Sequence, residues 1–440
     1  MISHALALWL TFFIFLNPIP PINTHQASNL PAGLADAHSE RRQDTVSHPD
    51  QFLEDLMGRY PQYFEKILRN RDSLKVQIIY TQVNRGANNN PAFRDFYFNV
   101  DSTKYFYPAS TVKLPVALLS LQKLNELRLP GLNKNSSMVT GSGYSGQTEV
   151  SNDPSSTDGR PSVAQYLKKI FLVSDNDAYN RLYEFLGQEY INEKLMKMGY
   201  PGAQINHRLE VSMTEDENRH TNPVTFYDPS GKLLYLQPMQ FSQRKYLARR
   251  DSIGIGYYKD GQLIHHAMDF SRKNRIYLQD LHQMLRSIIF PSMVPMNQRF
   301  NLSEDDYRFV YQCMSEFPPE SRFPFYDSAS YWDAYGKLLY WGSDKGALPK
   351  NIRIFNKEGD AYGFLTDISY FVDFDRHIEF FLSATIYCNA DEIENDEVYD
   401  FDTVGLPFMK ALGRVIYDYE SKRERPNQPN LLPFRFAYEK

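Results

Sequence analysis

The chain has 440 residues, of which 42% are hydrophobic, so it is long enough for up to about three domains and apolar enough for a large core. Its formal charge of −5 lacks the basic excess that contact with phosphate backbones requires, and we expect no nucleic-acid partner. We also expect a monomer that needs no cofactor.

The first segment is an apolar run at residues 5–16, which ends at Asn17 and Pro18 and is too short to span a bilayer comfortably. It predicts that residues 1–28 are a signal peptide, which would direct a bacterial protein to the periplasm or the exterior. Because no Lys or Arg precedes the run, a retained membrane anchor is the alternative. Residues 29–50 are polar and predict a flexible lead-in to one domain at 51–440.

The remaining sequence predicts an α+β protein, because helix and strand signals do not alternate strictly. Residues 51–70 predict a helix interrupted at Pro61, and strands are expected at 74–82 and 94–99. The segment from about 108 to 345 is expected to be mostly helical. A helix should begin at Pro161, and the next two should end at Gly187 and Gly199. A further helix is expected at 278–290, and Ser303 with Asp306 should cap another. Strands at 352–356, 362–374 and 378–388 precede a last helix to about 419. The two ends of the chain would thus form one sheet, with the helical half inserted between them.

Two cysteines occur in the sequence, Cys313 and Cys388, and they fall on different predicted elements. Export would permit a disulfide between them, but we expect two buried free thiols. Nothing in the cysteine pattern predicts a metal site.

A candidate nucleophile lies at the entrance of an apolar helix, in the sequence Ser110-Thr111-Val112-Lys113. The spacing puts the Lys113 amine on the same helical face as the Ser110 hydroxyl, where the amine can remove its proton. For this role near neutral pH, the pKa of Lys113 must fall from about 10.4 to about 7, a change worth about 4 to 5 kcal/mol. Free backbone N–H groups at a helix entrance would favour a developing oxyanion. A buried stripe should hold this helix in place, formed by Leu114, Ala117, Leu118, Leu121, Leu124 and Leu127.

The same helix contains a second match to this spacing, at Ser120 and Lys123. One fragment of this kind is weak evidence on its own. For Ser120 we expect a structural role, in which its hydroxyl bonds to a carbonyl one turn earlier.

Two further motifs follow in chain order, Ser174-Asp175-Asn176 and Lys357-Glu358-Gly359. Together with Ser110 and Lys113 they resemble the motif set of class A β-lactamases and penicillin-binding proteins. The likeness to the class A β-lactamase family covers most of residues 60–420. It implies an antiparallel sheet of about five strands with flanking helices beside an all-α subdomain, and an active site in the seam between them.

The resemblance also implies a role for each motif residue in a serine hydrolase that acts on a β-lactam or a related amide or ester. Ser110 would carry the acyl group, and its backbone N–H would bind the oxyanion. Ser174 would pass a proton to the leaving nitrogen, Asn176 would contact the substrate amide and Lys113, and Lys357 would attract an anionic substrate group and lower the pKa of Lys113. Whether Lys113 or a carboxylate deprotonates Ser110 stays open at this point. The expected substrate-binding residues are Glu358, Gly359 and Tyr144.

Each of these residues also has a simpler interpretation. Ser174 and Asn176 could cap the helix that follows them, as Ser and Asn often do. Lys357, Glu358 and Gly359 could be an ordinary turn with solvated charges. The joint occurrence of all three motifs in order favours catalysis.

Two departures from the family pattern concern the substrate and the hydrolysis step. Glu358 stands where the family usually has Thr or Ser, so an anion replaces a hydroxyl that donates to the β-lactam carboxylate. Unless its side chain turns away, a ligand with an amine, or without a carboxylate, should fit better. Glu210, in a loop expected near 205–225, is our first choice for the glutamate that activates water, with Glu215 second and a surface role for both as the alternative. Thr214 stands where the family usually has Asn.

Residues 224–275 are expected to be an insertion, with a basic cluster at Lys245, Arg249 and Arg250. His265 and His266 could be read as metal ligands, but neighbours on a strand point to opposite sides, so a loop role is favoured. The insertion could be a lid or a surface that docks a partner.

Three functions are consistent with the sequence. The first is an exported serine hydrolase that forms and hydrolyses an acyl-enzyme. The second is a peptidase or esterase, similar to penicillin-binding proteins, with little β-lactam turnover. The third is a binder without catalysis on the same scaffold, which the complete set of motif residues disfavours.

Overall fold

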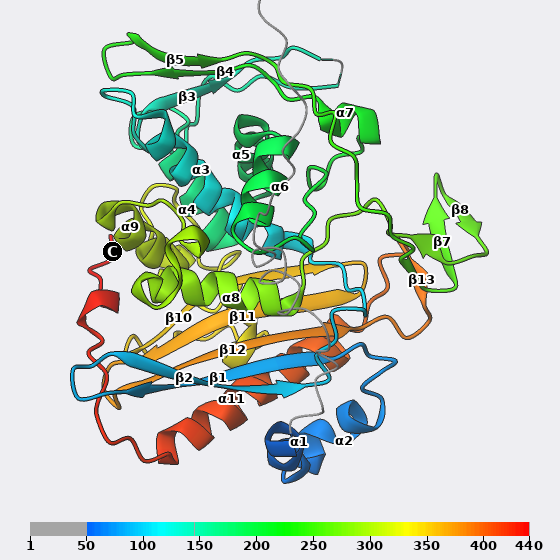
Figure 1. Cartoon of the computed structure of the whole chain (residues 1–440). Coiled ribbons are helices and arrows are strands. Elements are labelled where there is room, and N and C mark those ends of the chain that lie inside the picture. The colour runs from blue at the N-terminus through cyan, green and yellow to red at the C-terminus, as the bar shows by residue number, and fades with distance from the viewer. Residues whose placement is uncertain (1–50, 145, 440) are drawn as a thin grey trace, which may run out of the picture. The chain divides into compact units, whose positions relative to one another are not determined.

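The computed structural model of the protein describes residues 51–144 and 146–439. The expected signal peptide at 1–28 and the lead-in at 29–50 lie outside the described residues. The described domain consists of helices and mainly antiparallel sheets, so the predicted α+β class is confirmed (Figure 1).

A five-stranded antiparallel sheet contains strands from both ends of the domain, as the sequence predicts, in the order β10-β11-β12-β1-β2. The strands are β1 (Gln77–Arg85), β2 (Pro91–Phe98), β10 (Ile352–Ala361), β11 (Phe364–Asp373) and β12 (Ile378–Tyr387). The two ends of the chain meet where β1 pairs with β12, with Tyr80 opposite Leu382. β10 is an edge strand, and it continues to Ala361, past the end predicted at 356.

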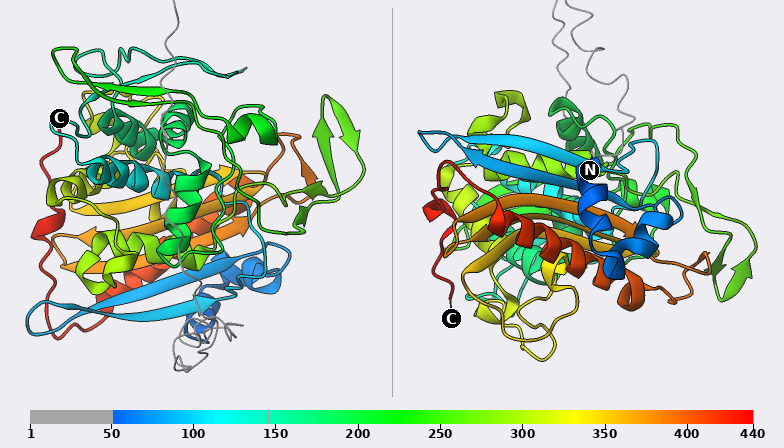
Figure 2. Two further views of the ribbon diagram at one scale, coloured as in Figure 1. Left: turned by 45° about the horizontal axis from the view of Figure 1, so that its top comes forward. Right: turned by 90° about the horizontal axis from the view of Figure 1, so that it is seen from below.

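Helices cover both faces of this sheet (Figures 1 and 2). One face packs against α1 (Gln51–Gly58), α2 (Pro61–Arg69) and α11 (Leu406–Lys422), next to the short α10 (Leu338–Trp341). The opposite face packs against α8 (Leu278–Ile289). The predicted interruption at Pro61 is confirmed, because this residue begins α2.

The helical half surrounds α3 (Lys113–Leu127), which continues from a short 3₁₀ turn at Ala109–Val112. The sequence predicts a single buried stripe on α3, but every residue from Lys113 to Leu124 is buried. Burial on all sides is typical of a helix enclosed by other elements. The helices that pack against α3 are α4 (Val163–Val173), α5 (Asn176–Leu186) and α6 (Gln188–Lys197). A helix in this position can hold its first turn rigidly.

Capping residues set several helix boundaries in this half. The Ser162 hydroxyl accepts a hydrogen bond from the N–H of Gln165, so the helix predicted from Pro161 begins at Val163. Gly187, with φ at +76°, ends α5 as predicted. Ser303 and Asp306 form the predicted capping box at the start of α9 (Glu304–Ser315).

Residues 224–275, expected to be an insertion, form short strands, two of which pair with strands outside that range. β4 (Val224–Tyr227) lies between β3 (Ser137–Thr140) and β5 (Leu233–Gln237) in a three-stranded sheet. The hairpin of β7 (Gly256–Lys259) and β8 (Gln262–Ile264) pairs with β13 (Ile393–Glu394), and β6 (Ser252–Ile253) pairs with β9 (Met268–Asp269). The mostly helical half thus also contains short strands.

The remaining short elements are α7 (Glu215–Arg219), 3₁₀ turns at Pro291–Met293, Met296–Gln298, Pro318–Glu320 and Leu432–Phe434, and a π-helical turn at Phe401–Gly405. Cys313 and Cys388 are buried free thiols, as predicted. Over residues 51–144 and 146–439, no helix has the length and apolar character to cross a bilayer. The same residues contain no group of three or more His, Cys, Asp or Glu side chains placed to hold a metal ion.

Candidate active site

The Ser110 side chain lies in the 3₁₀ turn that leads into α3 and is partly exposed to solvent. The Nζ atom of Lys113, one turn later, lies 2.8 Å from the Ser110 Oγ atom. Ala109, just before the serine, has φ at +45°, a conformation that non-glycine residues rarely adopt. Backbone strain of this kind gathers where a site must be held in a fixed geometry.

Lys113 is fully buried and has further polar neighbours besides Ser110. Its Nζ atom lies 2.6 Å from Asn176 Oδ1 and 3.2 Å from Ser174 Oγ, and it also contacts the Ser174 carbonyl oxygen. Burial first, and then the charge of Lys357, lower the pKa of Lys113 to about 7. A substantial fraction of Lys113 is therefore a neutral amine at physiological pH, which is the form that can accept a proton.

Ser174 and Asn176 come from the junction between α4 and α5, where Ser174 has φ at +58°. The alternative that these two residues cap the next helix is wrong. Asp175, between them, is the cap, because its side chain accepts a hydrogen bond of 2.8 Å from the N–H of Ala178. The side chains of Ser174 and Asn176 are thereby free to face Lys113.

Lys357 lies inside β10 and is fully buried, so the alternative of a solvated turn is also wrong. Its Nζ atom donates to Ser174 Oγ at 2.8 Å, to Glu358 Oε1 at 2.8 Å and to the Glu358 carbonyl at 2.9 Å. Burial acts to raise the pKa of Glu358, but the charge and hydrogen bond of Lys357 outweigh it, so this pKa lies below its ordinary value. Glu358 is therefore an ionised carboxylate bound to Lys357.

We name Ser110, Lys113, Ser174, Asn176 and Lys357 the Ser110 cluster. Gly359 brings β10 close to it. A Cβ atom at position 359 would lie 2.6 Å from the backbone nitrogen of Ser110 and 2.8 Å from that of Thr111. Any side chain here would overlap these atoms, so only glycine fits. The expected site residue Gly359 thus keeps space beside the Ser110 N–H group.

The loop expected near 205–225 is tied together by a buried ion pair between Arg208 and Glu184. Arg208 Nε donates to Glu184 Oε1 at 3.0 Å, and Arg208 Nη2 donates to the His220 carbonyl at 2.8 Å. Asn180 exchanges two hydrogen bonds, of 2.9 and 3.0 Å, with the backbone of Leu209. These contacts join the start of the loop to its end and to α5.

Glu210 follows directly and reaches the Ser110 cluster. The Asn176 Nδ2 atom donates to Glu210 Oε2 at 2.5 Å, while Asn176 Oδ1 contacts Lys113. Glu210 is exposed and has φ at +56°. One amide side chain thus links the candidate water-activating carboxylate to the candidate base.

Glu215 lies elsewhere. Its carboxylate pairs with Arg219 at 3.1 Å and with Arg272 at 3.8 Å. Thr214, which stands where the family usually has Asn, caps α7 through a capping box with Glu217. Of the two glutamates considered, the structure brings only Glu210 to the cluster.

Tyr144 packs on the same loop. Its ring stacks on His220 with centroids 3.8 Å apart, and its hydroxyl donates to Asp216 Oδ2 at 2.8 Å. These contacts place Tyr144 beside the end of the loop that carries Glu210. Its expected contact with substrate stays a prediction.

The second match to the serine–lysine spacing forms no pair. The Ser120 hydroxyl donates to the Val116 carbonyl at 2.8 Å, as predicted. Lys123 Nζ instead donates to the Phe185 carbonyl at 2.5 Å and to Gln237 Oε1 at 2.6 Å. Burial lowers the pKa of Lys123 to about 7, so a shifted lysine pKa alone does not mark the site.

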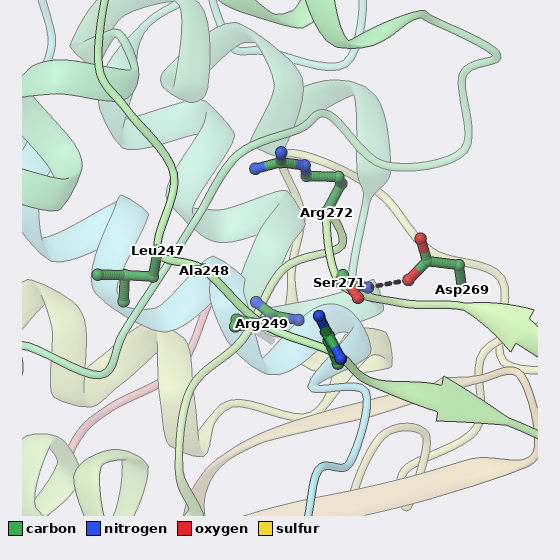
Figure 3. Close-up of a pocket in the computed structure, with 7 residues that line it drawn as sticks. Leu247, Ala248, Arg249, Asp269, Ser271 and Arg272 are labelled. Carbon is green, nitrogen blue, oxygen red and sulfur yellow. Dashed lines mark hydrogen bonds between the residues drawn. The ribbon is translucent and has the colours of Figure 1, made fainter.

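Two members of the basic cluster of the 224–275 segment, Arg249 and Arg250, line a separate hollow of about 520 Å³ (Figure 3). Its other lining residues are Leu247, Ala248, Asp269, Ser271 and Arg272. Arg249 donates to Asp251 Oδ2 at 2.6 Å and to the Phe270 and Lys273 carbonyls at 2.7 and 3.1 Å. Asp269 accepts from the Ser271 N–H at 2.8 Å, the contact drawn as a dashed line. Arg249 and Asp269 therefore hold this segment together. No residue of the Ser110 cluster lines the hollow.

The sequence interpretation missed two residues near the cluster. Asp360 follows the third motif on β10, and its negative charge acts on Lys113. Glu184 anchors Arg208 from α5. Asp360 could have been found from its place after Gly359, but the pairing of Glu184 depends on tertiary structure.

A serine hydroxyl beside a buried lysine, where helices meet the edge of an antiparallel sheet, defines a β-lactamase-like serine hydrolase. Residues 62–419 match the model of the β-lactamase enzyme family, and the chain belongs to this family. No curated protein matches the sequence.

Several solved structures are similar to this chain at low sequence identity. One is PBP-A, with a TM-score of 0.45, 13% identity and coverage of 86% of this chain and 97% of that one. A β-lactamase from Xanthomonas campestris has a TM-score of 0.43, 13% identity and coverage of 83% and 97%. A class A β-lactamase from Clostridium kluyveri has a TM-score of 0.44, 14% identity and coverage of 81% and 98%.

Proposed function

We propose that the protein hydrolyses a β-lactam or a related amide or ester through an acyl-enzyme on Ser110, in the manner of class A β-lactamases. One observation carries this proposal. The Nζ atom of Lys113 lies 2.8 Å from Ser110 Oγ, and the pKa of Lys113 is lowered to about 7. A neutral amine within hydrogen-bond distance is the activating partner that a serine nucleophile needs.

The acylation step follows from these contacts. Neutral Lys113 accepts the Ser110 hydroxyl proton while Ser110 Oγ forms a bond to the substrate carbonyl carbon. The carbonyl oxygen becomes an oxyanion, and the backbone N–H of Ser110 stabilises it in the space that Gly359 leaves open.

Breakdown of the tetrahedral intermediate requires a proton on the leaving nitrogen or oxygen. Ser174 Oγ lies 3.2 Å from Lys113 Nζ and 2.8 Å from Lys357 Nζ. The proton taken from Ser110 can therefore pass from Lys113 to Ser174 and on to the leaving atom as its bond to the carbonyl carbon breaks. Lys113 returns to the neutral state.

Deacylation requires a water molecule that attacks the acyl carbon. Glu210 is the carboxylate that we propose for this step, because it is exposed and is oriented toward the cluster by Asn176 at 2.5 Å. It accepts a proton from water as the new bond to the acyl carbon forms. The bond between Ser110 Oγ and the acyl carbon then breaks, and the proton held by Glu210 is returned to Ser110 Oγ, which regenerates both groups.

Intact-protein mass spectrometry tests the nucleophile. The protein is incubated with a fluorescent penicillin, a chromogenic cephalosporin and a neutral thioester. We expect one covalent adduct that Ser110→Ala abolishes and Ser120→Ala, the matched control on the same helix, leaves unchanged. An adduct that persists in Ser110→Ala, or no adduct with any compound, contradicts the proposal and would favour a binder without catalysis.

A second candidate function is a peptidase or esterase with little β-lactam turnover, similar to penicillin-binding proteins. The contact between the Glu358 carboxylate and Lys357 favours this second function, because the negative charge of Glu358 repels the carboxylate of a β-lactam. Labelling at Ser110 without hydrolysis of the cephalosporin would support this function, and fast hydrolysis would exclude it.

Export is a further part of the proposal. The apolar run at residues 5–16 supports a signal peptide over 1–28 and a periplasmic or secreted location. The mass of the mature N-terminal peptide tests cleavage, and a protein that keeps Met1 in the membrane fraction would instead be anchored.

A further inference from the structure

Lys357 has no free hydrogen-bond donor for a substrate. A lysine ammonium has three N–H donors. In this structure they are directed at Ser174 Oγ, Glu358 Oε1 and the Glu358 carbonyl, at 2.8, 2.8 and 2.9 Å. The Glu358 carboxylate thus occupies the position at which an acid group of a substrate would be recognised.

Burial strengthens this exclusion. The side chain of Lys357 is 0% exposed and that of Glu358 is 10% exposed. Glu358 also lies against Gly336, where a Cβ atom would be 3.2 Å from its carboxylate. A substrate carboxylate could reach Lys357 only by breaking this buried, hydrogen-bonded ion pair, which opposes its binding.

Other carboxylates near the cluster form no ion pair within 4.0 Å. Asp360 follows Gly359 on the edge strand β10 and is exposed, and Glu210 is exposed on the opposite loop. Over residues 51–144 and 146–439, no Lys, Arg or His side chain lies within 4.0 Å of the carboxylates of Asp360, Glu210 or Asp175. Their charges reach the reaction centre, since Asp175 and Asp360 both act on Lys113.

Carboxylates therefore outnumber ammonium groups around the Ser110 cluster. The nearby cations are Lys357, which is paired with Glu358, and the buried Lys113 and Lys337, whose pKa values burial lowers to about 7 and about 8. The nearby carboxylates are Glu358, Asp360, Glu210 and Asp175. A negative potential of this kind attracts cationic ligands and repels anionic ones. A substrate with an acid group would instead require a positive potential.

We propose that the substrate carries a cationic ammonium group near the scissile amide or ester carbonyl and no carboxylate at that position. Glu358 excludes the acid, and Asp360, next to Gly359 and without an ion-pair partner within 4.0 Å, receives the ammonium. This inference rests on the proposed acyl-enzyme function and specifies the class of substrate. Glu358 and Asp360 determine substrate specificity, and the residues of the Ser110 cluster carry out the reaction steps.

Three thioesters that differ in a single substituent beside the carbonyl test the inference. The substituents are trimethylammonium, its neutral isostere tert-butyl, and carboxylate. We expect kcat/KM to fall in that order, with the cationic thioester favoured over the anionic one by about 100-fold or more, as expected for two charge contacts that each change affinity about tenfold. Equal rates with all three would overturn the inference and leave the proposed function intact.

Substitutions at Asp360 and Glu358 test which residue sets the preference for the charge of the substrate. Asp360→Asn should reduce kcat/KM for the cationic thioester about tenfold more than for the neutral one, mainly through KM. Glu358→Gln should raise kcat/KM for the anionic thioester about tenfold. Glu65→Gln, on the distant helix α2, is the control for general charge effects. Because Asp360 is exposed, Asp360→Asn remains a test even if Glu358→Gln fails to fold.

Different results would contradict the acyl-enzyme function and the inferred substrate class. If none of the thioesters is hydrolysed and none labels Ser110, the acyl-enzyme function itself is wrong. If Ser110 is acylated but the anionic thioester reacts fastest, only the inferred substrate class is wrong.

Discussion

Lys113 and Lys123 lie on the same buried helix, and burial lowers the pKa of each to about 7, yet only Lys113 contacts a serine hydroxyl. Ser120, the counterpart of Ser110, bonds to a backbone carbonyl instead. A lysine with a lowered pKa is therefore not sufficient for a nucleophile–base pair. The geometry at the first turn of α3, set by Ala109 and Gly359, makes the difference.

Gly359 provides the first prediction. Gly359→Ala should reduce the acylation rate of Ser110 by about 100-fold or more, because the added Cβ would crowd the amide that stabilises the oxyanion. The clash distance is 2.6 Å to Ser110 N. Stopped-flow labelling measures the rate. Gly346→Ala is the control, since a Cβ there meets no heavy atom within 4 Å, and an equal loss in both variants would argue against this role.

Glu210 provides the second prediction. Glu210→Gln should leave acylation nearly unchanged and slow deacylation by about 100-fold or more, because the variant cannot take a proton from water. The acyl-enzyme should then accumulate and be visible by mass spectrometry. Glu215→Gln is the matched control, since Glu215 pairs with Arg219. Unchanged turnover in Glu210→Gln would remove this residue from the mechanism.

The third prediction concerns stability at acidic pH. Burial first, and then Lys273, lower the pKa of His207 to about 4, below the ordinary 6.5. Between these values the unfolded chain binds a proton at His207 that the folded protein does not bind, so His207 contributes a decrease of about 1.4 kcal/mol per pH unit in the free energy of unfolding as pH decreases. Urea unfolding at pH 4.5 to 7 measures it. His207→Asn should show a shallower slope, and identical slopes would contradict the assignment.

The fourth prediction uses the two neighbours that shift the pKa of Lys113 in opposite directions. Lys357 lowers this pKa and Glu358 raises it. Lys357→Met should therefore move the ascending limb of the acylation rate, where the rate increases with pH, to higher pH, and Glu358→Gln should move it to lower pH. Shifts in the same direction for both variants would show that the limb does not report Lys113.

The central sheet could be predicted from the sequence because its strands have strong local signals and long apolar runs. The pairing of the short strands β4 and β7 with β3 and β13 could not, because these partners are distant in the sequence. The burial of α3 on all sides also depends on how many elements surround it. The apolar stripe of α3 predicted burial of one face of the helix only.

The candidate site was predicted better than the contacts within it. Three ordered motifs were enough to select the members of the Ser110 cluster. The motifs did not indicate that Asp175 is the helix cap, which frees Ser174 and Asn176. Nor did they show that Glu358 turns onto Lys357, because side-chain direction on an edge strand depends on the tertiary environment.

The pH dependence of Ser110 acylation is the most direct test that Lys113 is the base. Stopped-flow labelling by a neutral thioester, whose charge does not change with pH, should give a rate that rises with pH and is half-maximal near 7, matching the pKa of Lys113 of about 7. Lys113→Met should abolish the rise and the labelling, while Lys123→Met should keep both. A rate that shows no inflection between pH 5 and 9, or labelling that survives in Lys113→Met, would contradict the assignment.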